Sequence, residues 1–585
     1  MKGFYGKLLR INLTDKSHVV ENIPDQVLKS YLGGKGLGSY LLLNNVPAGT
    51  YPLGHDNKLI FTTGPGTDTI LPGASRYGIY SKSPLTGMYA ESYSGGRVAP
   101  AMRRTGYDAI IIEGVSAEPV YLVVSDEEVT FRDASHLWGM DTYSTEDSVL
   151  AEVGVAGAQA VVIGPAGENM VHFACVENNY WRSAGRTGMG AVMGSKKLKA
   201  MVFCGGARCE IAHPELLKEE VDRLRQRAKD NPGVKAYQTY GTPVMVGIMN
   251  GAKAFPTRYW SEGSYDRWRE ISGDAHQQNF KVRSRSCPQC FLACGKDTEV
   301  AAGRHAGLRL EGPEYETIYS FGGLCCIDRL DEIIYLNDIC DRLGIDTITA
   351  GNLAGLVMEA SKRGGLDFSL EYGDAVGVAR LLNDMASRSG LGEDLSRGIK
   401  HFSEKWNLED IAVHVKGLEP AGYDPRVLKG MGLAFATSTR GACHLRATFY
   451  KPELSGMIDP STTEGKASLF VDFENRLAIF NTMILCVFFR DLYQWDHLIP
   501  IIHAITGCRY TKEELEKTAN DIITLTRRFN AGEGATKQMD TLPPKLFNEA
   551  INGGNSAITR EELQSMVDDY YSIRGWDDEG YPAAD

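Results

Sequence analysis

The 585-residue sequence lacks the segments that would place it in or across a membrane. No stretch contains the ~20 consecutive apolar residues that a membrane span requires, and no basic start followed by an apolar run marks a secretion signal. We therefore expect a protein without a membrane span, located in the cytoplasm. In that reducing compartment, the twelve cysteines are expected to be free thiols or metal ligands rather than disulfides.

Basic residues are fewer than acidic residues in this sequence. The chain has 62 Lys and Arg against 74 Asp and Glu, which gives a formal net charge of −12. Because a nucleic-acid partner requires a basic face, this balance argues against nucleic acid and favours a small metabolite. The length predicts about three to four domains, and 43% hydrophobic residues are enough to bury their cores.

A second C-x2-C pair is also missing, although three cysteines lie close together. Cys287, Cys290 and Cys294 form a C-x2-C-x3-C run, which brings three thiolates within reach of one inorganic centre. A structural zinc site is the alternative, but it would need a second pair of ligands from elsewhere. The run therefore favours an iron–sulfur site that transfers electrons.

The pattern of apolar residues changes near residue 210. Before it, short β-branched and apolar runs separated by Gly and Pro predict strands. These runs are 7–13, 58–62, 76–81, 109–113, 120–124, 129–132 and 160–163. After it, helical patterns begin at Pro214, cover 330–343 with a stop near Gly344, and begin again at the capping box of Thr511 and Glu514. The chain is thus predicted to be α+β, with a β-rich first part and a mainly helical remainder.

Glycine-rich motifs are concentrated in the β-rich part, and we interpret them as loops. They lie at 33–38, 64–66, 94–96, 164–167 and 184–190. Such loops can bring backbone N–H groups close to a phosphate. Basic residues stand beside them, namely Lys35, Arg76, Arg182, Arg186 and Lys196. Together they predict a large anionic cofactor across this domain, whereas a Rossmann site is disfavoured because crossover helices do not alternate with the strands.

These motifs resemble, in sequence and in order, those of the tungsten-containing aldehyde:ferredoxin oxidoreductases. The resemblance runs essentially from end to end. It rests on segments 6–14, 31–38, 82–87, 106–114, 163–169, 184–196, the cysteine run, 312–317 and 424–426. It implies a β-rich base domain at residues 1–208 that binds the cofactor, with helical domains at 209–418 and 419–585 closing over it.

The resemblance also implies the cofactors. A tungsten ion, or molybdenum in its place, would be held by two pyranopterins, with Mg²⁺ bridging their phosphates and one [4Fe–4S] cluster passing electrons out. Cys287, Cys290, Cys294 and the distant Cys486 would hold the cluster. Arg76 matches the arginine expected between pterin and cluster.

Pterin contacts are implied by two further motifs. Residues 341–346 match the pattern D-x-x-G-L-D with Ile in place of Leu, and the expected contacts are Asp341, Gly344, Ile345 and Asp346. The second motif, at 481–486, matches the related pattern D-x-x-G-L-C less well, because Asn481 replaces Asp and Ile484 replaces Gly. Leu485 is a further expected contact in this motif. The other expected cofactor contacts are Ser94, Gly95, Gly96, Ala184, Gly185 and Arg186, of which Ser94 and Ala184 would lie near the magnesium.

The implied reaction oxidises an aldehyde to a carboxylic acid. A carboxylate from Glu314 or Glu316 would activate water, and His444 would hydrogen-bond the carbonyl oxygen. The sequence leaves open which of the two glutamates faces the metal. Cys325 is a candidate tungsten ligand, with a buried structural thiol as the alternative. Electrons would pass to ferredoxin or to an iron–sulfur partner subunit, and a homodimer or larger complex is compatible with the sequence.

Two other functions remain open on the sequence alone. An acyl-CoA reductase acting on aromatic thioesters would share the fold, although segment 312–316 favours aldehyde oxidation. A non-enzymatic iron–sulfur electron carrier would contain iron without tungsten or molybdenum. Metal analysis and assays with aldehydes and a viologen dye would separate the three.

Overall fold

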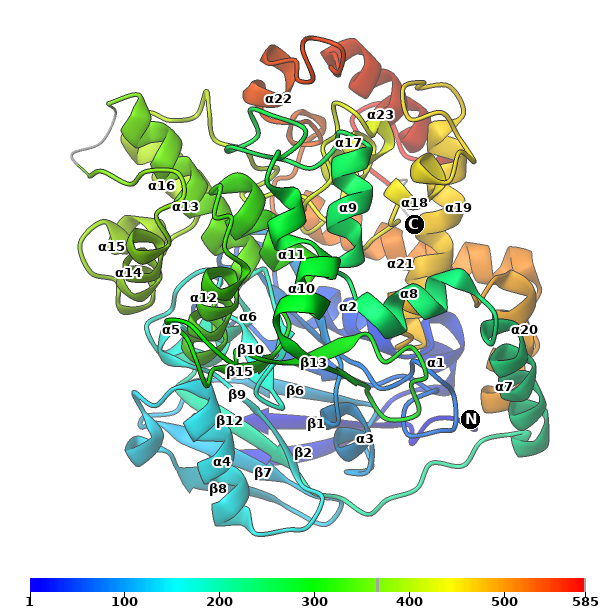
Figure 1. Cartoon of the computed structure of the whole chain (residues 1–585). Helices are drawn as coiled ribbons and strands as arrows, with labels where there is room; N and C mark the ends of the chain where they lie inside the picture. Colours follow the sequence, from blue (N-terminus) through cyan, green and yellow to red (C-terminus); the bar gives the residue numbers. More distant parts are fainter. Residues whose placement is uncertain (365–367, 583–585) are drawn as a thin grey trace.

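Two sheets form the base of the molecule, and helices lie above them (Figure 1). The computed structural model describes residues 1–364 and 368–582, so the last three residues of the third expected domain lie outside the described residues. The strands of the base are β1 Lys7–Asn12, β2 Ser17–Asn22, β3 Leu59–Thr62, β4 Tyr77–Lys82, β5 Tyr89–Ser94, β6 Ala109–Glu113, β7 Val120–Val124, β8 Val129–Asp133, β9 Gln159–Val162, β10 Val176–Asn178, β11 Arg182–Ala184 and β12 Leu198–Phe203. The predicted α+β class with a β-rich first part is confirmed.

The two sheets of the base have six strands each and similar pairing. The first follows the order β2-β1-β6-β3-β4-β5, and the second follows β11-β10-β9-β12-β7-β8. Each contains one parallel pair, β1 with β6 and β7 with β12, and the other neighbours are antiparallel. Antiparallel neighbours need no crossover helix, which agrees with the missing Rossmann pattern.

Short helices connect the strands of the base. They are α1 Asp25–Tyr31, α2 Gly34–Asn45, α3 Val98–Arg103, α4 Thr142–Val153, α5 Pro165–Glu168 and α6 Met189–Ser195. Three glycine motifs that we interpret as loops from the sequence begin helices instead, at α2, α5 and α6. Helices α2 and α6 are mostly buried, and small residues let them pack closely against their neighbours.

Helices dominate the chain after residue 210. They are α7 Pro214–Ala228, α8 Pro232–Tyr240, α9 Val244–Gly251, α10 Gly273–Asn279, α11 Tyr315–Thr317, α12 Leu330–Leu343, α13 Thr347–Lys362, α14 Ala375–Ser387, α15 Leu391–Leu395, α16 Ile399–Trp406, α17 Lys429–Thr437, α18 Tyr450–Leu454, α19 Lys466–Thr482, α20 Trp495–Thr506, α21 Lys512–Gly532, α22 Pro544–Asn548 and α23 Arg560–Arg574. The expected starts at Pro214 and Thr511 and the helix at 330–343 are confirmed. In the described part of the chain, no helix has both the length and the apolar character to cross a bilayer.

A small third sheet within the helical part was not expected. It consists of β13 Lys281–Arg285, β14 Gly295–Glu299 and β15 Arg309–Glu311. Its strands are polar and short, so their apolar alternation is too weak to be seen in the sequence. The three clustered cysteines lie in the loop between β13 and β14, and the sheet therefore fixes both ends of this loop.

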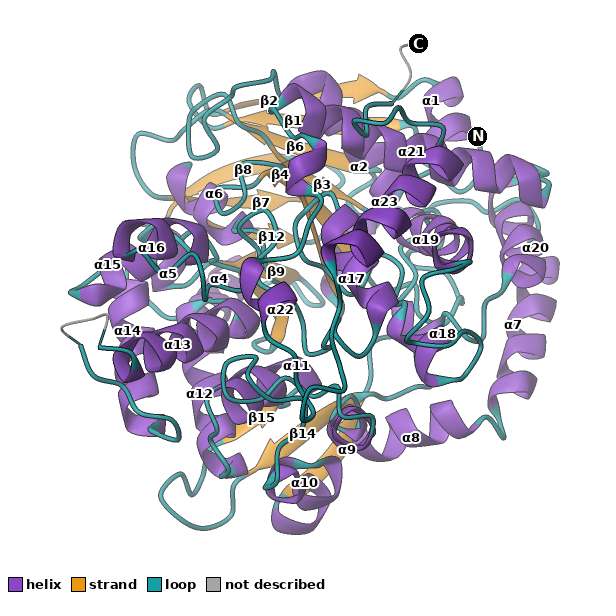
Figure 2. Cartoon of the chain, turned by 90° about the horizontal axis from the view of Figure 1, so that it is seen from above, coloured by secondary structure: helices purple, strands orange, loops and turns teal. Residues whose placement is uncertain are grey.

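The base and the helices meet across a shared core. Helix α2 packs on β3 and β4 on one side and on α19 and α21 on the other. Seen from above, loops occupy the centre of the molecule and helices surround them (Figure 2). The boundaries expected at residues 208 and 418 stay predictions.

Candidate functional site

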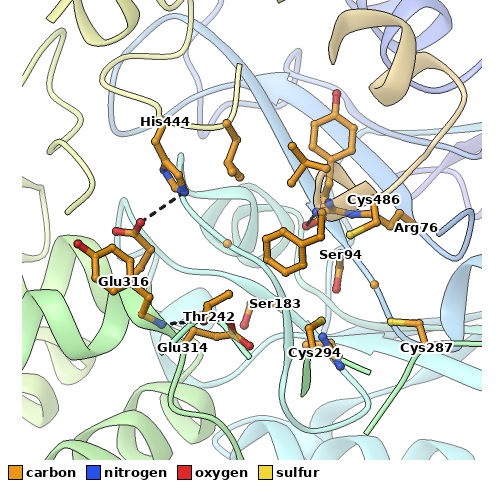
Figure 3. Close-up of a pocket in the computed structure, with 18 of the residues that line it drawn as sticks. Arg76, Ser94, Ser183, Thr242, Cys287, Cys294, Glu314, Glu316, His444 and Cys486 are labelled. Carbon is orange, nitrogen blue, oxygen red and sulfur yellow. Dashed lines mark hydrogen bonds and ion pairs between the residues drawn. The ribbon is translucent and has the colours of Figure 1, made fainter. Parts of the chain in front are cut away.

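A cavity of about 380 Å³ lies between the base and the helices (Figure 3). Twelve of the site residues expected from the sequence line it, although they come from widely separated parts of the chain. These are Arg76, Ser94, Gly95, Gly185, Arg186, Cys287, Cys290, Cys294, Glu314, Glu316, His444 and Cys486. The cavity is therefore the candidate site.

The four cysteines expected to bind a cluster lie on one part of this cavity. Burial, with Cys486 and Cys287 as neighbours, raises the pKa of Cys290 to about 12. The N–H of Gly96 donates to the sulfur of Cys287 at 3.2 Å, which holds this thiol against the end of β5. Within the described residues, no three His, Cys, Asp or Glu side chains converge on a position for a single ion.

The two expected pterin motifs have the same local geometry. Residues 341–346 span the C-terminal end of α12, and residues 481–486 span the C-terminal end of α19. Gly344 has a φ of 74°, and Ile484, at the equivalent position, has a φ of 61°. In both motifs the next residue donates its N–H five positions back, Ile345 to Cys340 at 3.0 Å and Leu485 to Phe480 at 2.8 Å. Ile484 thus adopts the left-handed conformation that glycine usually provides.

Each motif packs closely against a glycine of the base. A Cβ on Gly164 would lie 2.5 Å from the carbonyl oxygen of Leu343, in the first motif. A Cβ on Gly34 would lie 2.2 Å from the carbonyl oxygen of Asn481, in the second motif. Neither approach is open to a larger residue. Each motif is therefore held close to the base.

Other expected contacts lie behind the cavity wall rather than on it. They are Gly96, Ala184, Asp341, Gly344, Ile345, Asp346, Asn481 and Leu485. Asp346 begins α13 by accepting from the N–H groups of Ile348 and Thr349, and it pairs with the Nε of Arg186 at 3.2 Å. Asp346 does not line the cavity itself, but it forms an ion pair with Arg186, which does.

Cys325 does not line the cavity either. Its side chain is fully buried at the end of the π-helical segment 318–324, where its sulfur lies 3.4 Å from the carbonyl oxygen of Gly351. Burial raises the pKa of its thiol well above the usual value. The thiol of Cys325 thus contacts a backbone carbonyl in the helical part of the chain.

Glu316 and His444 face each other at the other end of the cavity. The Nε2 of His444 lies 3.5 Å from Oε1 of Glu316, and Oε2 accepts from the N–H of Gly422 at 3.0 Å (Figure 3). Burial raises the pKa of Glu316 to about 7. Burial, together with Arg186, Arg440 and Arg446, holds the pKa of His444 well below its usual value. The pair can therefore accept and place a proton near neutral pH.

Glu314 lies toward the cysteines instead. Its Oε2 accepts from the hydroxyl of Thr242 at 2.5 Å, and the same hydroxyl accepts from the N–H of Tyr315. Burial raises the pKa of Cys294 well above its usual value, and the charge of Glu314 adds to this effect. Glu316 thus faces His444, and Glu314 faces the cysteine loop.

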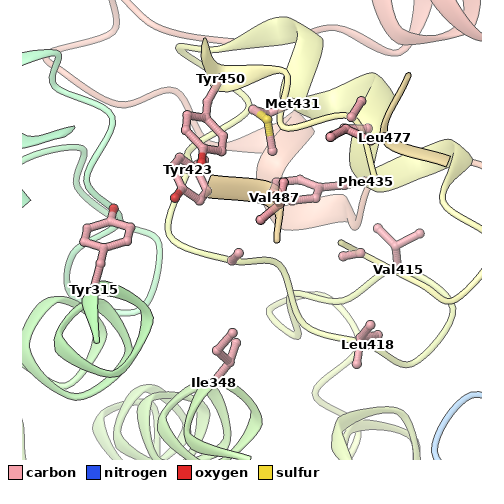
Figure 4. Close-up of a cluster of buried hydrophobic side chains, with 14 of the residues drawn as sticks. Tyr315, Ile348, Val415, Leu418, Tyr423, Met431, Phe435, Tyr450, Leu477 and Val487 are labelled. Atoms are coloured by element: carbon pink, nitrogen blue, oxygen red, sulfur yellow. The ribbon is translucent and has the colours of Figure 1, made fainter. Parts of the chain in front are cut away.

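Aromatic side chains form the wall beside His444. The ring of Tyr423 stacks on His444 with centroids 5.5 Å apart and on Tyr450 with centroids 4.1 Å apart. Tyr315 lies 5.6 Å from Tyr423, and its hydroxyl donates to the carbonyl of Gly422. Figure 4 shows these rings at the edge of a larger apolar cluster. They hold the imidazole in one orientation.

Several cavity residues were not expected from the sequence. Arg446 lines the wall near β5, and Tyr237, Tyr423 and Tyr450 line it elsewhere. Arg446 stands in a Gly-containing segment next to His444, which is a weak signal without its partner. Conversely, Lys35 and Lys196, which we expected beside the cofactor, are buried away from the cavity in contacts within the protein.

Two family models match almost the whole chain. The model described as "Aldehyde ferredoxin oxidoreductase, N-terminal domain" matches residues 8–205, and "Aldehyde ferredoxin oxidoreductase, domains 2 & 3" matches residues 219–585. The fold and its thiol-lined cavity are those of an oxidoreductase. The chain belongs to the aldehyde ferredoxin oxidoreductase family.

Individual relatives agree with this assignment. The chain is 34% identical over 597 residues to a tungsten-containing aldehyde ferredoxin oxidoreductase of Pyrococcus furiosus, covering 99% of this chain and 97% of the relative. It is 29% identical over 621 residues to a WOR-like subunit of an aliphatic sulfonate oxidoreductase from the same organism, covering 100% of this chain and 96% of the relative. Its fold is similar to that of the active site complex BamBC of benzoyl coenzyme A reductase bound to 1,5-dienoyl-CoA, with a TM-score of 0.86, 24% identity and coverage of 100% and 96%.

Proposed function

We propose that this enzyme oxidises an aldehyde to a carboxylic acid. The reaction adds the oxygen of one water to the aldehyde carbon and releases two electrons and two protons. Four relatives that are 34 to 36% identical over 99% of the chain bear the name of such an enzyme. The observation that carries the proposal is the Glu316 and His444 pair, which shares a cavity with four thiols.

The cavity residues fit the cofactors of such an enzyme. The thiols of Cys287, Cys290, Cys294 and Cys486 would hold a [4Fe–4S] cluster. The related motifs at 341–346 and 481–486 match two halves of a bis-pyranopterin, and Ser94 and Ala184 are the expected neighbours of its magnesium ion. When bound, a tungsten or molybdenum centre takes up the two electrons and the cluster passes them on singly.

Arginines supply the charge that an anionic cofactor requires. Arg76, Arg182, Arg186, Arg440 and Arg446 all line the cavity. Arg182 pairs with Glu311, and Arg186 pairs with Asp346 and Glu419. Arg446 pairs with Glu91, whereas neither Arg76 nor Arg440 has a carboxylate at ion-pair distance among the described residues. These two guanidinium groups favour a ligand with phosphates.

Glu316 and His444 perform the proton chemistry. As a carboxylate, Glu316 accepts a proton from the attacking water, because its Oε1 lies in the cavity without a well-formed hydrogen bond. The neutral imidazole of His444 donates to the carbonyl oxygen of the aldehyde and stabilises the negative charge that develops there. The stacked ring of Tyr423 keeps the imidazole in place for this contact.

The electron acceptor would be ferredoxin or an iron–sulfur partner subunit. The loop that contains Cys287, Cys290 and Cys294 includes the exposed residues Ser286 and Gln289. A small redox protein can therefore approach the position of the cluster from outside.

The proposal is tested by purifying the full chain with its metals. Elemental analysis should find tungsten or molybdenum together with iron, and a panel of aldehydes should reduce a viologen dye. Glu316→Gln should abolish dye reduction, whereas Glu513→Gln, on an exposed helix start, should leave it unchanged. Iron without tungsten or molybdenum, or reduction of acyl-CoA thioesters without aldehyde oxidation, would overturn the proposal in favour of an electron carrier or an acyl-CoA reductase.

A further inference from the structure

A second cavity, of about 330 Å³, lies away from the candidate site. Three parts of the chain form it: the turn before β5, helix α16 with the segment that follows it, and the residues that lead into α22. Met88, just before β5, lines this cavity, whereas Ser94, at the end of β5, lines the candidate site. Six residues of extended chain separate the two, which is about 20 Å. In the described part of the chain, the two cavities share no residue, so a ligand in the second would not contact Glu316 or His444.

Apolar side chains form most of the wall of the second cavity. Met88, Ala412, Val415, Leu542 and Pro543 are all buried there. A methionine side chain is flexible and adapts to ligands of different shape. The volume is at the lower end of the range of about 300–1,000 Å³ that is typical of small-molecule sites. The cavity thus fits a small molecule with a hydrocarbon body.

His414 supplies a hydrogen-bond donor to this cavity. Its Nδ1 accepts from the N–H of Gly417 at 3.2 Å, so the proton of the neutral ring is on Nε2. Burial and the charge of Lys400 lower the pKa of His414 to about 4, and the imidazole is therefore neutral at neutral pH. Within residues 1–364 and 368–582, no group accepts from this Nε2. Because His414 lines the cavity, its N–H is available to a ligand there.

The charged groups beneath and beside the cavity are positive in sum. Nζ of Lys416 lies 2.6 Å from Oδ1 of Asp540, and Oδ2 of Asp540 accepts from Arg527 at 2.8 Å. All three side chains are buried, so one negative charge faces two positive charges. Lys416 also donates to two backbone carbonyls, and it therefore contributes charge rather than a free N–H. Lys400 is exposed at the mouth and has no ion-pair partner among the described residues.

We propose that this second cavity binds a small monocarboxylate with an apolar body. Nε2 of His414 donates to the carboxylate, and the charges of Lys416 and Lys400 attract it. The hydrocarbon part of the ligand packs on the apolar wall and leaves water. A neutral molecule of the same size would leave the excess positive charge beneath the cavity unbalanced.

A dianion such as phosphate fits this cavity less well. It would expose its oxygens to the apolar wall without enough donors to satisfy them. Glu404 and Glu409 are exposed at the mouth and would repel two negative charges more strongly than one. The proposed reaction releases a carboxylic acid, which belongs to the favoured class. The site itself requires no aldehyde oxidation, because its residues are separate from those of the candidate site.

The binding test is a calorimetric titration of hexanoate into the full chain, purified with its cofactors. Hexanol, which has a similar body without the charge, should bind about tenfold more weakly, and so should acetate, which has the charge without the body. His414→Leu removes the N–H at similar volume and should weaken hexanoate binding about tenfold. Leu542→Trp fills the cavity and should abolish binding. A wild type that binds no hexanoate, or that binds hexanol equally well, would overturn the proposal.

An exposed position keeps the test decisive if a buried variant does not fold. Lys400→Met should weaken hexanoate binding about threefold. Lys405→Met, exposed on the same helix but outside the cavity, is the matched control and should change nothing. Equal affinity in the wild type and in Lys400→Met and every folded cavity variant would place the ligand elsewhere and refute the site.

Crystals soaked with 6-bromohexanoate locate the ligand directly. The anomalous peak of bromine should lie in the second cavity, and a peak in the candidate site alone would refute the proposal. Hexanoate binding as expected, in a protein that oxidises no aldehyde, would refute only the proposed function.

Discussion

The imidazole Nε2 of His444 lies 3.5 Å from the carboxylate Oε1 of Glu316, and both side chains are withdrawn from water. Burial raises the carboxyl pKa of Glu316 to about 7. Burial and nearby arginines hold the imidazole pKa of His444 well below its usual range. Near neutral pH, the histidine is therefore a neutral hydrogen-bond donor, and the glutamate is the group that changes its charge.

The rate of aldehyde oxidation should rise with pH through about 7. Below this value Glu316 is protonated and cannot accept a proton from water, and above it the carboxylate is available. Glu316→Gln should lower kcat by about 10²- to 10⁴-fold and remove this rise. The measurement is kcat/KM for one aldehyde from pH 5 to 9. A flat profile in the wild type would show that Glu316 is not the base.

Tyr423→Phe should move the rising limb of the same profile to higher pH. The hydroxyl of Tyr423 lowers the pKa of Glu316. Loss of the Tyr423 hydroxyl should raise the apparent pKa of Glu316 by about one unit, equivalent to ~1.4 kcal/mol. Phenylalanine retains the stacking on His444. Tyr450→Phe, which removes a hydroxyl from the next ring in the stack, is the matched control. This variant should not change the pH at which the rate rises.

The sequence predicts those parts of the molecule in which local pattern determines structure. The helix at 330–343 and its end at Gly344 follow from periodicity and from a left-handed cap, and the structure has both. The short polar strands β13 to β15 lack such a pattern and could not be predicted. The same holds for the helical start at Gly34, where burial against other helices overrides the low helix propensity of glycine.

The candidate site depends more on contacts between distant residues. The run Cys287 to Cys294 is visible locally, whereas Cys486 could be placed only by resemblance to a family. The different neighbours of Glu314 and Glu316, which are Thr242 and His444, could not be predicted from the sequence. Arg440 meets Glu91 across 349 positions of the chain, and no local pattern predicts such a pair.

Cys486→Ser should remove most of the iron from the purified protein. A [4Fe–4S] cluster needs four thiolates, and Cys486 lies on the cavity with Cys287, Cys290 and Cys294. The wild type should contain about four iron atoms per chain. Cys204→Ser, at a half-buried thiol in the base, is the control and should retain them. Full iron content in Cys486→Ser would exclude this cysteine as a ligand.

Cys325→Ser should leave the tungsten X-ray absorption spectrum unchanged. The thiol lies against the carbonyl of Gly351 and does not line the cavity. The spectrum counts the sulfur atoms around the metal, so it reports directly on the ligand hypothesis for Cys325. Loss of one sulfur scatterer in the variant would support that hypothesis and contradict the present expectation.

Asp424→Asn should strongly destabilise the protein. Asp424 and Arg426 form an ion pair at 2.6 Å with both side chains completely buried, and Arg426 also donates to the carbonyls of Trp260 and Glu549. Removing one charge leaves the other buried without its partner, which costs about 3–5 kcal/mol. The measurement is the midpoint of unfolding in denaturant for the full chain.

The matched control is an exposed pair of the same type. Lys517 and Asp521 face solvent on α21, with side chains 76% and 45% exposed. Because water already screens these charges, Asp521→Asn should change the free energy of unfolding by about 0–1 kcal/mol. Asp424 also directly follows Tyr423, which stacks on His444, and its own N–H donates to the carbonyl of Ala254 at 3.1 Å. If both variants unfold at the same midpoint, the buried pair does not anchor this segment, and the orientation of Tyr423 must come from its stacking on Tyr450 alone.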